Sequence, residues 1–210
     1  FNRYFEIFNP TSDTVILDDY AWARVGGNPT TVGVYETWND FTPGAVILPN
    51  DIYIVAHSNS DAFIINQADM TSQLLSNGDD GLALVHGDEP LTPTHPDSGL
   101  YTILDWIGDW NGDPGTGWDV AGITAGTANH TLVRKCEVMM GDTSWTNAAG
   151  TDPTNSQWVV FGNENWNYLG SHSNSTIYSS TFDTICGGLS ITVNGNVYDS
   201  SGVYVDTLIS

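Results

Sequence analysis

The chain is a succession of short runs rich in β-branched and aromatic residues, separated by turn-forming residues. The run over residues 4–8 ends at Asn9 and Pro10, and the run over 45–48 is followed by the turn signal of residues 49–51. Runs of this length and spacing, without helical periodicity between them, predict an all-β sandwich. The expected strands cover residues 4–8, 14–17, 33–38, 45–48, 52–56, 81–86, 101–107, 131–135 and 158–161.

One segment departs from the strand pattern. Ser60 can cap a short helix in which Ala62, Ile65 and Ala68 recur at a three-residue spacing. We expect one or two such short helices in the whole chain.

The C-terminal stretch has the pattern of a separate small β module. Runs over residues 189–193 and 196–198 flank Asn194 and Gly195, a dipeptide that favours a type I′ hairpin turn. A third run over 203–209 follows. We therefore predict a sandwich over residues 1–173, a linker over 174–184, and the start of a second β module over 185–210.

Charge limits the partners of this protein. Lys and Arg number 4 and Asp and Glu 25, so the formal net charge is −21. Nucleic acids and anionic membrane surfaces need a basic face, so both are excluded as partners. The sequence also has no apolar run near the roughly 18 residues that membrane insertion needs. Lys135 is the only lysine, and so acidic a surface suits a salty extracellular medium, where cations screen self-repulsion.

Four blocks, taken together and in this order, resemble the bacterial branch of the lamin-tail domain. They are residues 4–11 (YFEIFNPT), residues 77–85 (NGDDGLALV), residues 117–122 (GWDVAG) with 130–135 (HTLVRK), and Trp158 with 169–172 (LGSH). The resemblance covers about residues 1–173. The tail also loosely resembles short β repeats of surface proteins exported by type IX secretion.

The lamin-tail resemblance implies an immunoglobulin-like β-sandwich. It also implies a domain of large secreted or surface proteins, which often stands beside enzymes and is not itself a catalyst. Members usually have another strand before the first block. That strand is either outside this sequence or supplied by another chain, and the sequence leaves both alternatives open.

A glycine-rich loop offers oxygen ligands for a cation. Asp109, Asn111, Asp113 and Asp119 are hard donors of the kind that calcium prefers. The loop is not an EF-hand, because Pro114 stands where glycine is needed and no Glu closes the loop. The alternative is a solvated turn in which Asp side chains cap backbone N–H groups. Calcium is the one candidate cofactor, and the hypothesis predicts that it raises the melting temperature.

The tryptophans have two interpretations, as core or as sugar-binding platforms. Trp106 can share a buried face with its strand, and Trp118, Trp145 and Trp158 are expected to fill the sandwich interior. Trp110 is the best candidate for an exposed ring that stacks on a glycan.

Arg134, His130 and His172 are assigned structural roles. Arg134 is expected to pair with a carboxylate and fasten a loop, with an anion site as the alternative. The two histidines are expected to fasten loops by hydrogen bonds, with a ligand role as the alternative. Cys136 and Cys186 fit no zinc pattern, and their pairing is left open.

No enzyme class is indicated. Nucleophile-elbow, zinc-protease and P-loop motifs are absent, and the five histidines are dispersed. The expected function is a non-catalytic extracellular structural or interaction domain: a spacer, adhesin or fibre subunit that contacts other chains of a surface assembly or neighbouring domains. The alternative is an accessory module that targets a secreted enzyme through glycan or calcium binding.

Overall fold

The computed structural model describes residues 1–172, 191–193 and 196–198. The chain divides into two compact units, Phe1–His172 and Ser173–Ser210. The expected linker over 174–184 and the expected strand over 203–209 lie outside the described residues. In the second unit, β12 (Ile191–Val193) pairs antiparallel with β13 (Asn196–Tyr198). These are two of the strands predicted for this region.

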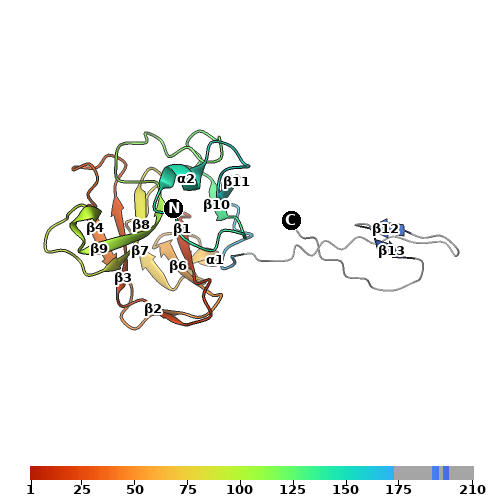
Figure 1. The fold of residues 1–210 in the computed structure, drawn as a ribbon, viewed down its shortest axis with the longest axis horizontal. Helices are drawn as coiled ribbons and strands as arrows, with labels where there is room; N and C mark the ends of the chain where they lie inside the picture. Colours follow the sequence, from red (N-terminus) through yellow and green to blue (C-terminus); the bar gives the residue numbers. More distant parts are fainter. Residues whose placement is uncertain (173–190, 194–195, 199–210) are drawn as a thin grey trace. The chain divides into compact units, whose positions relative to one another are not determined.

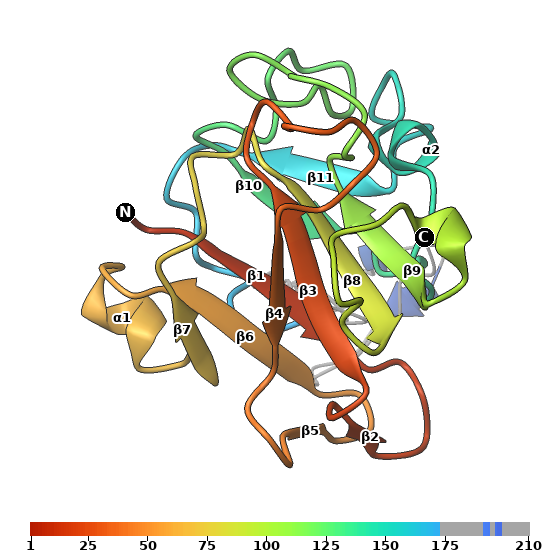
Figure 2. The same cartoon turned by 90° about the vertical axis from the view of Figure 1, so that its left-hand side faces the viewer.

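Two sheets form the first unit. The larger sheet is antiparallel, and its strands lie side by side in the order β4 (Thr37–Asp40), β3 (Tyr20–Val25), β8 (Gly81–Gly87), β9 (Tyr101–Ile107) (Figure 2). The smaller sheet has the order β1 (Tyr4–Phe8), β6 (Ile52–His57), β7 (Met70–Ser72), and its last pair is parallel. The predicted all-β sandwich is confirmed (Figure 1).

Two further ladders and short helical turns complete the unit. The ladders are β2 (Val15–Ile16) with β5 (Val46–Ile47), and β10 (Thr131–Arg134) with β11 (Trp158–Phe161). The helices are α1 (Ala62–Ile65), α2 (Trp145–Ala149) and the 3₁₀ turn Pro96–Ser98. Two short α-helices in the described residues agree with the expected number.

Several expected elements are placed differently. Helix α1 is capped by Asp61, whose carboxylate accepts the Phe63 N–H, and not by Ser60. The strand expected over 33–38 begins only at Thr37, because Gly33 adopts a φ of 78° in the turn before it. Strands β3 and β7 were not predicted at all, although β3 is a central strand of the larger sheet.

The larger sheet is covered on both faces. On one face Trp22, Leu82 and Leu84 point toward Phe5 and Ile7 of β1, so this face forms the space between the two sheets. The other face carries small side chains and is covered by α2 and by loops. The buried side chains of that second cluster include Ala21, Ala23, Ala83, Val85, Tyr35, Trp106, Trp110, Trp145 and Trp158.

Asn9 fastens the end of β1 to the β2–β5 end of the unit. Its side chain is 3% exposed. The amide Nδ2 donates to the carbonyl oxygens of Asp13, Ile47 and Leu48 at 2.8, 3.0 and 3.1 Å. Its Oδ1 accepts from the backbone N–H and the hydroxyl of Thr11. One amide therefore satisfies groups from two separate segments, residues 11–13 and residues 47–48.

We predict that Asn9→Asp lowers the free energy of unfolding by about 2–3 kcal/mol, because a carboxylate would face three carbonyl oxygens that need a donor. Chemical denaturation at pH 7 measures the change. Asn165→Asp is the matched control, since Asn165 uses only its Oδ1 as an acceptor, from Asn167 N–H. An equal effect of the two substitutions would contradict the role assigned to Asn9.

Candidate functional site: a cleft between two strand edges

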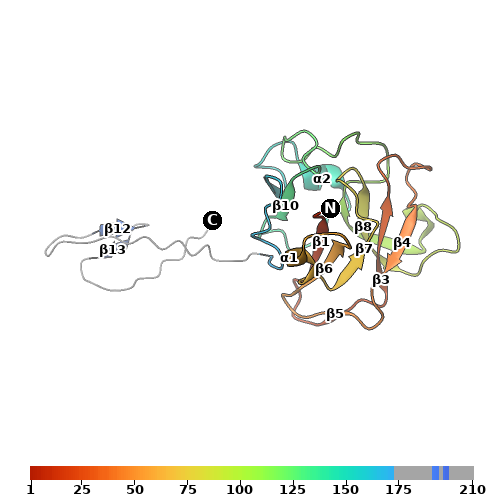
Figure 3. The ribbon, with the colours of Figure 1, turned by 180° about the vertical axis from the view of Figure 1, so that it is seen from behind.

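A cleft of about 630 Å³ lies in the first unit, between β1 and β10. Every residue of β1 and every residue of β10 lines it. Its lining also includes Leu82 and Leu84 of β8, from the larger sheet. Because consecutive residues of both strands line the cleft, it is bounded by the edges of two strands and not only by their side chains. Figure 3 shows β1 and β10 as separate strands of this unit.

The open edge of β1 presents unpaired backbone groups. In an antiparallel ladder the N–H and C=O of alternate residues point to opposite sides. His57 N–H donates to Arg3 O, and Asn9 N–H donates to Asp51 O, so the odd-numbered residues of β1 face β6. The N–H and C=O groups of Tyr4, Glu6 and Phe8 therefore point away from β6.

The open edge of β10 also presents unpaired backbone groups. Lys135 N–H donates to Gln157 O, which fixes residues 131 and 133 as those that face β11. The backbone groups of Leu132 and Arg134 consequently point away from β11. Neither β1 nor β10 has a second neighbouring strand among the described residues.

The side chains between the sheets are incompletely covered. Phe5 and Ile7 of β1 point inward, as do Leu82 and Leu84 of β8, and all four are only half-buried. In a filled sandwich, inward side chains of this size are normally fully buried. The cleft thus opens the space between the sheets to solvent.

Unpartnered polar atoms gather at the cleft. Six buried side-chain nitrogen or oxygen atoms have no hydrogen-bond partner among the described residues, and four of them belong to residues that line the cleft. These four are Trp22 Nε1, Arg134 Nε, Trp158 Nε1 and His172 Nε2. Trp22 is 1% exposed. Three of the four are obligatory donors, so an acceptor is the complementary group.

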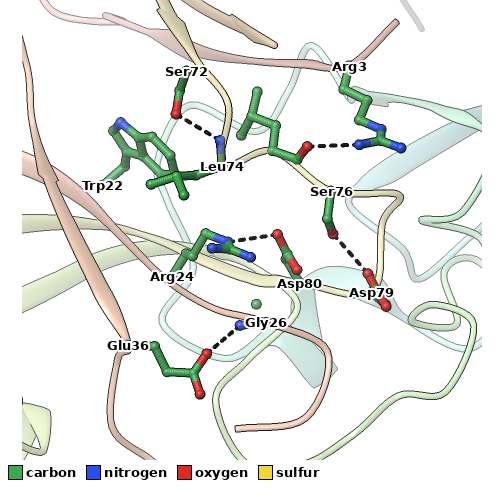
Figure 4. A network of polar contacts seen from close by, with 12 residues as sticks. Arg3, Trp22, Arg24, Gly26, Glu36, Ser72, Leu74, Ser76, Asp79 and Asp80 are labelled. Atoms are coloured by element: carbon green, nitrogen blue, oxygen red, sulfur yellow. Dashed lines mark hydrogen bonds and ion pairs between the residues drawn. The ribbon is translucent and has the colours of Figure 1, made fainter. Parts of the chain in front are cut away.

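One end of the cleft is held by charged side chains (Figure 4). Arg3 Nη1 donates to Leu75 O at 3.0 Å. Arg24 Nε donates to Asp80 Oδ2 at 2.8 Å, in an ion pair that is almost fully buried. The first bond fixes the segment between β7 and β8 against the start of β1, and the second fixes it against β3.

Arg134 holds the wall on the β10 side. Its Nη1 donates to Asp105 Oδ2 at 2.7 Å and its Nη2 to Gln157 Oε1 at 2.5 Å, while the guanidinium lies 4.5 Å from the ring centre of Trp158. The structure thus gives Arg134 the carboxylate partner predicted from the sequence, here from β9. Both terminal nitrogens of the guanidinium are therefore engaged within the protein, whereas Nε has no acceptor among the described residues.

The two histidines of the matched blocks line the cleft in different ways. His130 Nδ1 lies 2.7 Å from Ala128 O and donates within its own loop. His172 Nε2 is buried without a hydrogen-bond partner in the described part of the chain, and the ring centre lies 4.2 Å from that of Phe8. Burial, and secondarily the charge of Arg134, lower the pKa of His172. The expected hydrogen bond is therefore present for His130, whereas a ring contact takes its place at His172.

Glu6 is the titratable group that the sequence did not single out. It extends from β1 and its Oε1 accepts the Gly170 N–H at 2.8 Å. Burial raises the pKa of Glu6 to about 7, although that hydrogen bond acts in the opposite direction. Burial, and then the charge of Glu6, also raise the pKa of Tyr4 to about 12. The cleft wall therefore changes its charge near neutral pH.

The structure does not assemble the expected calcium site. Asp109, Asp113 and Asp119 each accept a different backbone N–H through Oδ1, from Asn111, Gly115 and Ala125. No group of three His, Cys, Asp or Glu side chains that could hold a metal occurs within the described ranges. These carboxylates act as caps in turns, which is the alternative that the sequence left open.

The expected exposure of Trp110 is wrong. Its side chain is 1% exposed, its Nε1 donates to Gly81 O, and its ring meets Trp106 edge-on at 4.8 Å. The glycine-rich loop folds back over the larger sheet, and a Cβ on Gly81 would collide with Asp109 O. Trp110 therefore belongs to the core and offers no surface for a glycan.

The other tryptophans lie near their predicted places. Trp106, Trp145 and Trp158 are buried, and Trp118 is half-buried against the same cluster, with its Nε1 bonded to Asp80 O. Cys136 is half-buried and free, and Cys186 lies outside the described residues.

No protein-family model, curated protein or solved structure matches this chain. The lamin-tail resemblance therefore stays a prediction from the sequence. Across the part of the chain that the structure describes, no helix has the length and apolar character needed to cross a bilayer.

We predict that Glu6→Gln stabilises the protein more at pH 8 than at pH 5. The pKa of Glu6 is raised from 4.5 to about 7 on folding. The contribution is therefore fully present below pH 4.5 and is lost as the pH rises through 7, because the unfolded chain releases this proton first. Gln keeps the acceptor for Gly170 and removes the titration. Thermal melts over pH 4–8 measure the difference.

Glu36→Gln is the control, and its effect on stability is expected to have the opposite sign at neutral pH. Backbone hydrogen bonds from Gly26 and Thr30 lower the pKa of Glu36. Its contribution is present above the ordinary pKa of Glu and is lost as the pH falls through the lowered value. Glu36→Gln should therefore destabilise the protein at neutral pH and much less in acid. A wild-type-like pH profile for Glu6→Gln would contradict the assignment of a raised pKa.

We predict equal melting temperatures in millimolar calcium and in excess chelator. Each of the three loop carboxylates accepts a backbone hydrogen bond in a separate turn. We therefore do not expect them to converge on one calcium ion. Calorimetry at constant ionic strength makes the comparison, with magnesium as the control for non-specific screening. A rise in melting temperature with calcium alone would restore the calcium hypothesis.

Proposed function

We propose that this chain is a non-catalytic interaction module of a larger secreted or cell-surface protein, and that it joins other polypeptides of an extracellular assembly. The observation that carries the proposal is the cleft between the open edges of β1 and β10. An unpaired strand edge beside half-buried inward side chains can contact another chain, and folded proteins normally cover such an edge.

The polar groups of the cleft support a binding role more than a catalytic one. Arg134, Asp105 and Gln157 are engaged with one another, and Arg24 is paired with Asp80. His130 and His172 have the separate loop and ring contacts described above. No nucleophile bonded to an oriented base occurs among these groups, which is the arrangement that acyl transfer needs.

Charge supports an extracellular role. The net charge of −21 opposes close association of identical chains at low ionic strength, and this repulsion weakens in a salty medium. The resemblance of the sequence to bacterial lamin-tail domains agrees with the same location. The buried Trp110 removes the observation that favoured glycan targeting, so that alternative is not proposed.

The test is the mass of the native protein, released from its cell surface or culture medium, by light scattering. We expect a mass well above that of one polypeptide, and a lower mass for Val133→Asp, which places a charge on a side chain that lines the cleft. Val159→Asp is the matched control, because Val159 is the direct partner of Val133 in the ladder and does not line the cleft.

Each outcome of this measurement decides the proposal. A mass that falls only with Val133→Asp supports it. A single-polypeptide mass for the wild-type protein would contradict it and would favour an accessory module that acts alone. A mass unaffected by Val133→Asp would place the assembly contact outside the cleft.

A further inference from the structure

We propose that the pair Asn111-Gly112, in the glycine-rich loop after β9, is a site of spontaneous deamidation through a succinimide. The modification needs only water as co-reactant, and it leaves an aspartate or an isoaspartate at position 111. The site lies outside the cleft and goes beyond the proposed function. The consequence of the modification is a looser loop over the buried ring of Trp110.

The same reactive tripeptide occurs in two structural settings. An asparagine followed by glycine is prone to this reaction, because glycine has no side chain to restrict the approach of its backbone nitrogen. The chain contains three such pairs, Asn77-Gly78, Asn111-Gly112 and Asn194-Gly195, and the third lies outside the described residues. The first two are both followed by aspartate. A difference in rate between these two sites in the folded protein therefore reports on the fold.

The reaction is an intramolecular acyl transfer between adjacent residues. The backbone nitrogen of Gly112 gives its proton to water or hydroxide and attacks Cγ of Asn111. The new C–N bond closes the succinimide ring, and the Cγ–Nδ2 bond breaks as ammonia leaves with a proton. Water then adds to one of the two ring carbonyls and opens the ring at one C–N bond, without any oxidant or reductant. The rate depends on how freely the backbone reaches the geometry of attack.

The structure leaves the backbone at Gly112 free to reach that geometry. The side chain of Asn111 is exposed. The N–H of Gly112 donates no hydrogen bond within the described part of the chain. A Cβ built on Gly112 would meet no atom within 4 Å. The attacking nitrogen is therefore accessible, and the ring can close without displacing a neighbouring segment.

The backbone at Gly78, in contrast, is held in place. Its φ is 106°, and a Cβ there would collide with Thr127 O. Its carbonyl oxygen accepts the hydroxyl of Thr127 at 2.5 Å. In the same turn the hydroxyl of Ser76 donates to Asp79 Oδ1 at 2.9 Å. Ring closure here has to move the glycine against the backbone of Thr127, so the fold protects Asn77.

The modification falls beside a buried ring. Asn111 N–H donates to Asp109 Oδ1 at 2.7 Å, and Trp110 O accepts the Gly33 N–H at 2.7 Å. Isoaspartate inserts a methylene group into the backbone directly after these bonds. Either product also adds a carboxylate that stands in the sequence between Asp109 and Asp113, and like charges repel. The loop therefore loosens over Trp110, which is 1% exposed in the unmodified protein.

The experiment incubates the full chain at mildly alkaline pH and follows each asparagine by peptide mapping with mass spectrometry. We expect Asn111 to react at least about tenfold faster than Asn77 in the folded protein. In the chain unfolded by denaturant the two rates should become similar, because the tripeptides are identical. Gly112→Ala should slow the reaction at Asn111 by about tenfold and keep the fold, because the position has open space and no left-handed φ.

Thermal melts of the converted protein test the consequence for the loop. We expect a melting temperature lower by about 2–4 °C. Asn111→Asp carries the added charge without the extra methylene and should shift the melting temperature less. Equal rates at Asn77 and Asn111 in the folded protein would overturn the proposal, as would an unreactive Asn111 over a period in which the unfolded chain reacts. An unchanged melting temperature after conversion would overturn the effect assigned to the loop.

Discussion

The need of every strand edge for a partner is the constraint on which this structure depends. In the larger sheet, β3 and β8 pair on both sides, and their outer neighbours β4 and β9 close the arrangement against loops and helix α2. In the opposite layer the pairing stops at β1 on one side and at β10 on the other. The half-buried leucines of β8, the unpartnered indole nitrogens and the raised pKa of Glu6 all occur around that break.

An ion pair and a charged hydrogen bond hold the two walls of the cleft in place without filling it. Arg134 connects β10 to Asp105 on the larger sheet, and Arg3 connects β1 to the carbonyl of Leu75. Removing one partner from a buried pair leaves an uncompensated charge, so these contacts resist collapse of the walls toward each other.

The sandwich could be predicted from the sequence because most of its strands contain runs of apolar β-branched residues, as β6 (Ile52–His57) does. It missed β3, whose Ala21, Ala23 and Arg24 have little intrinsic preference for strands; tertiary packing against Ala83 and Val85 decides their conformation. Trp110 was misplaced for a related reason. Local composition around it is that of an exposed turn, and only the return of the loop over the sheet buries the ring.

Local patterns alone did not reveal the cleft, because it depends on which strands lack a neighbour; the resemblance to lamin-tail domains, whose members usually have another strand before the first block, was the signal for an unpaired edge at β1. A single run such as Tyr4–Phe8 does not reveal whether one or both of its edges are paired. Glu6 in the middle of that run was the available signal, since a carboxylate between apolar neighbours reports either a solvated face or an unusual environment. The structure selects the second: the segment that contains Gly170 covers the side chain and raises its pKa.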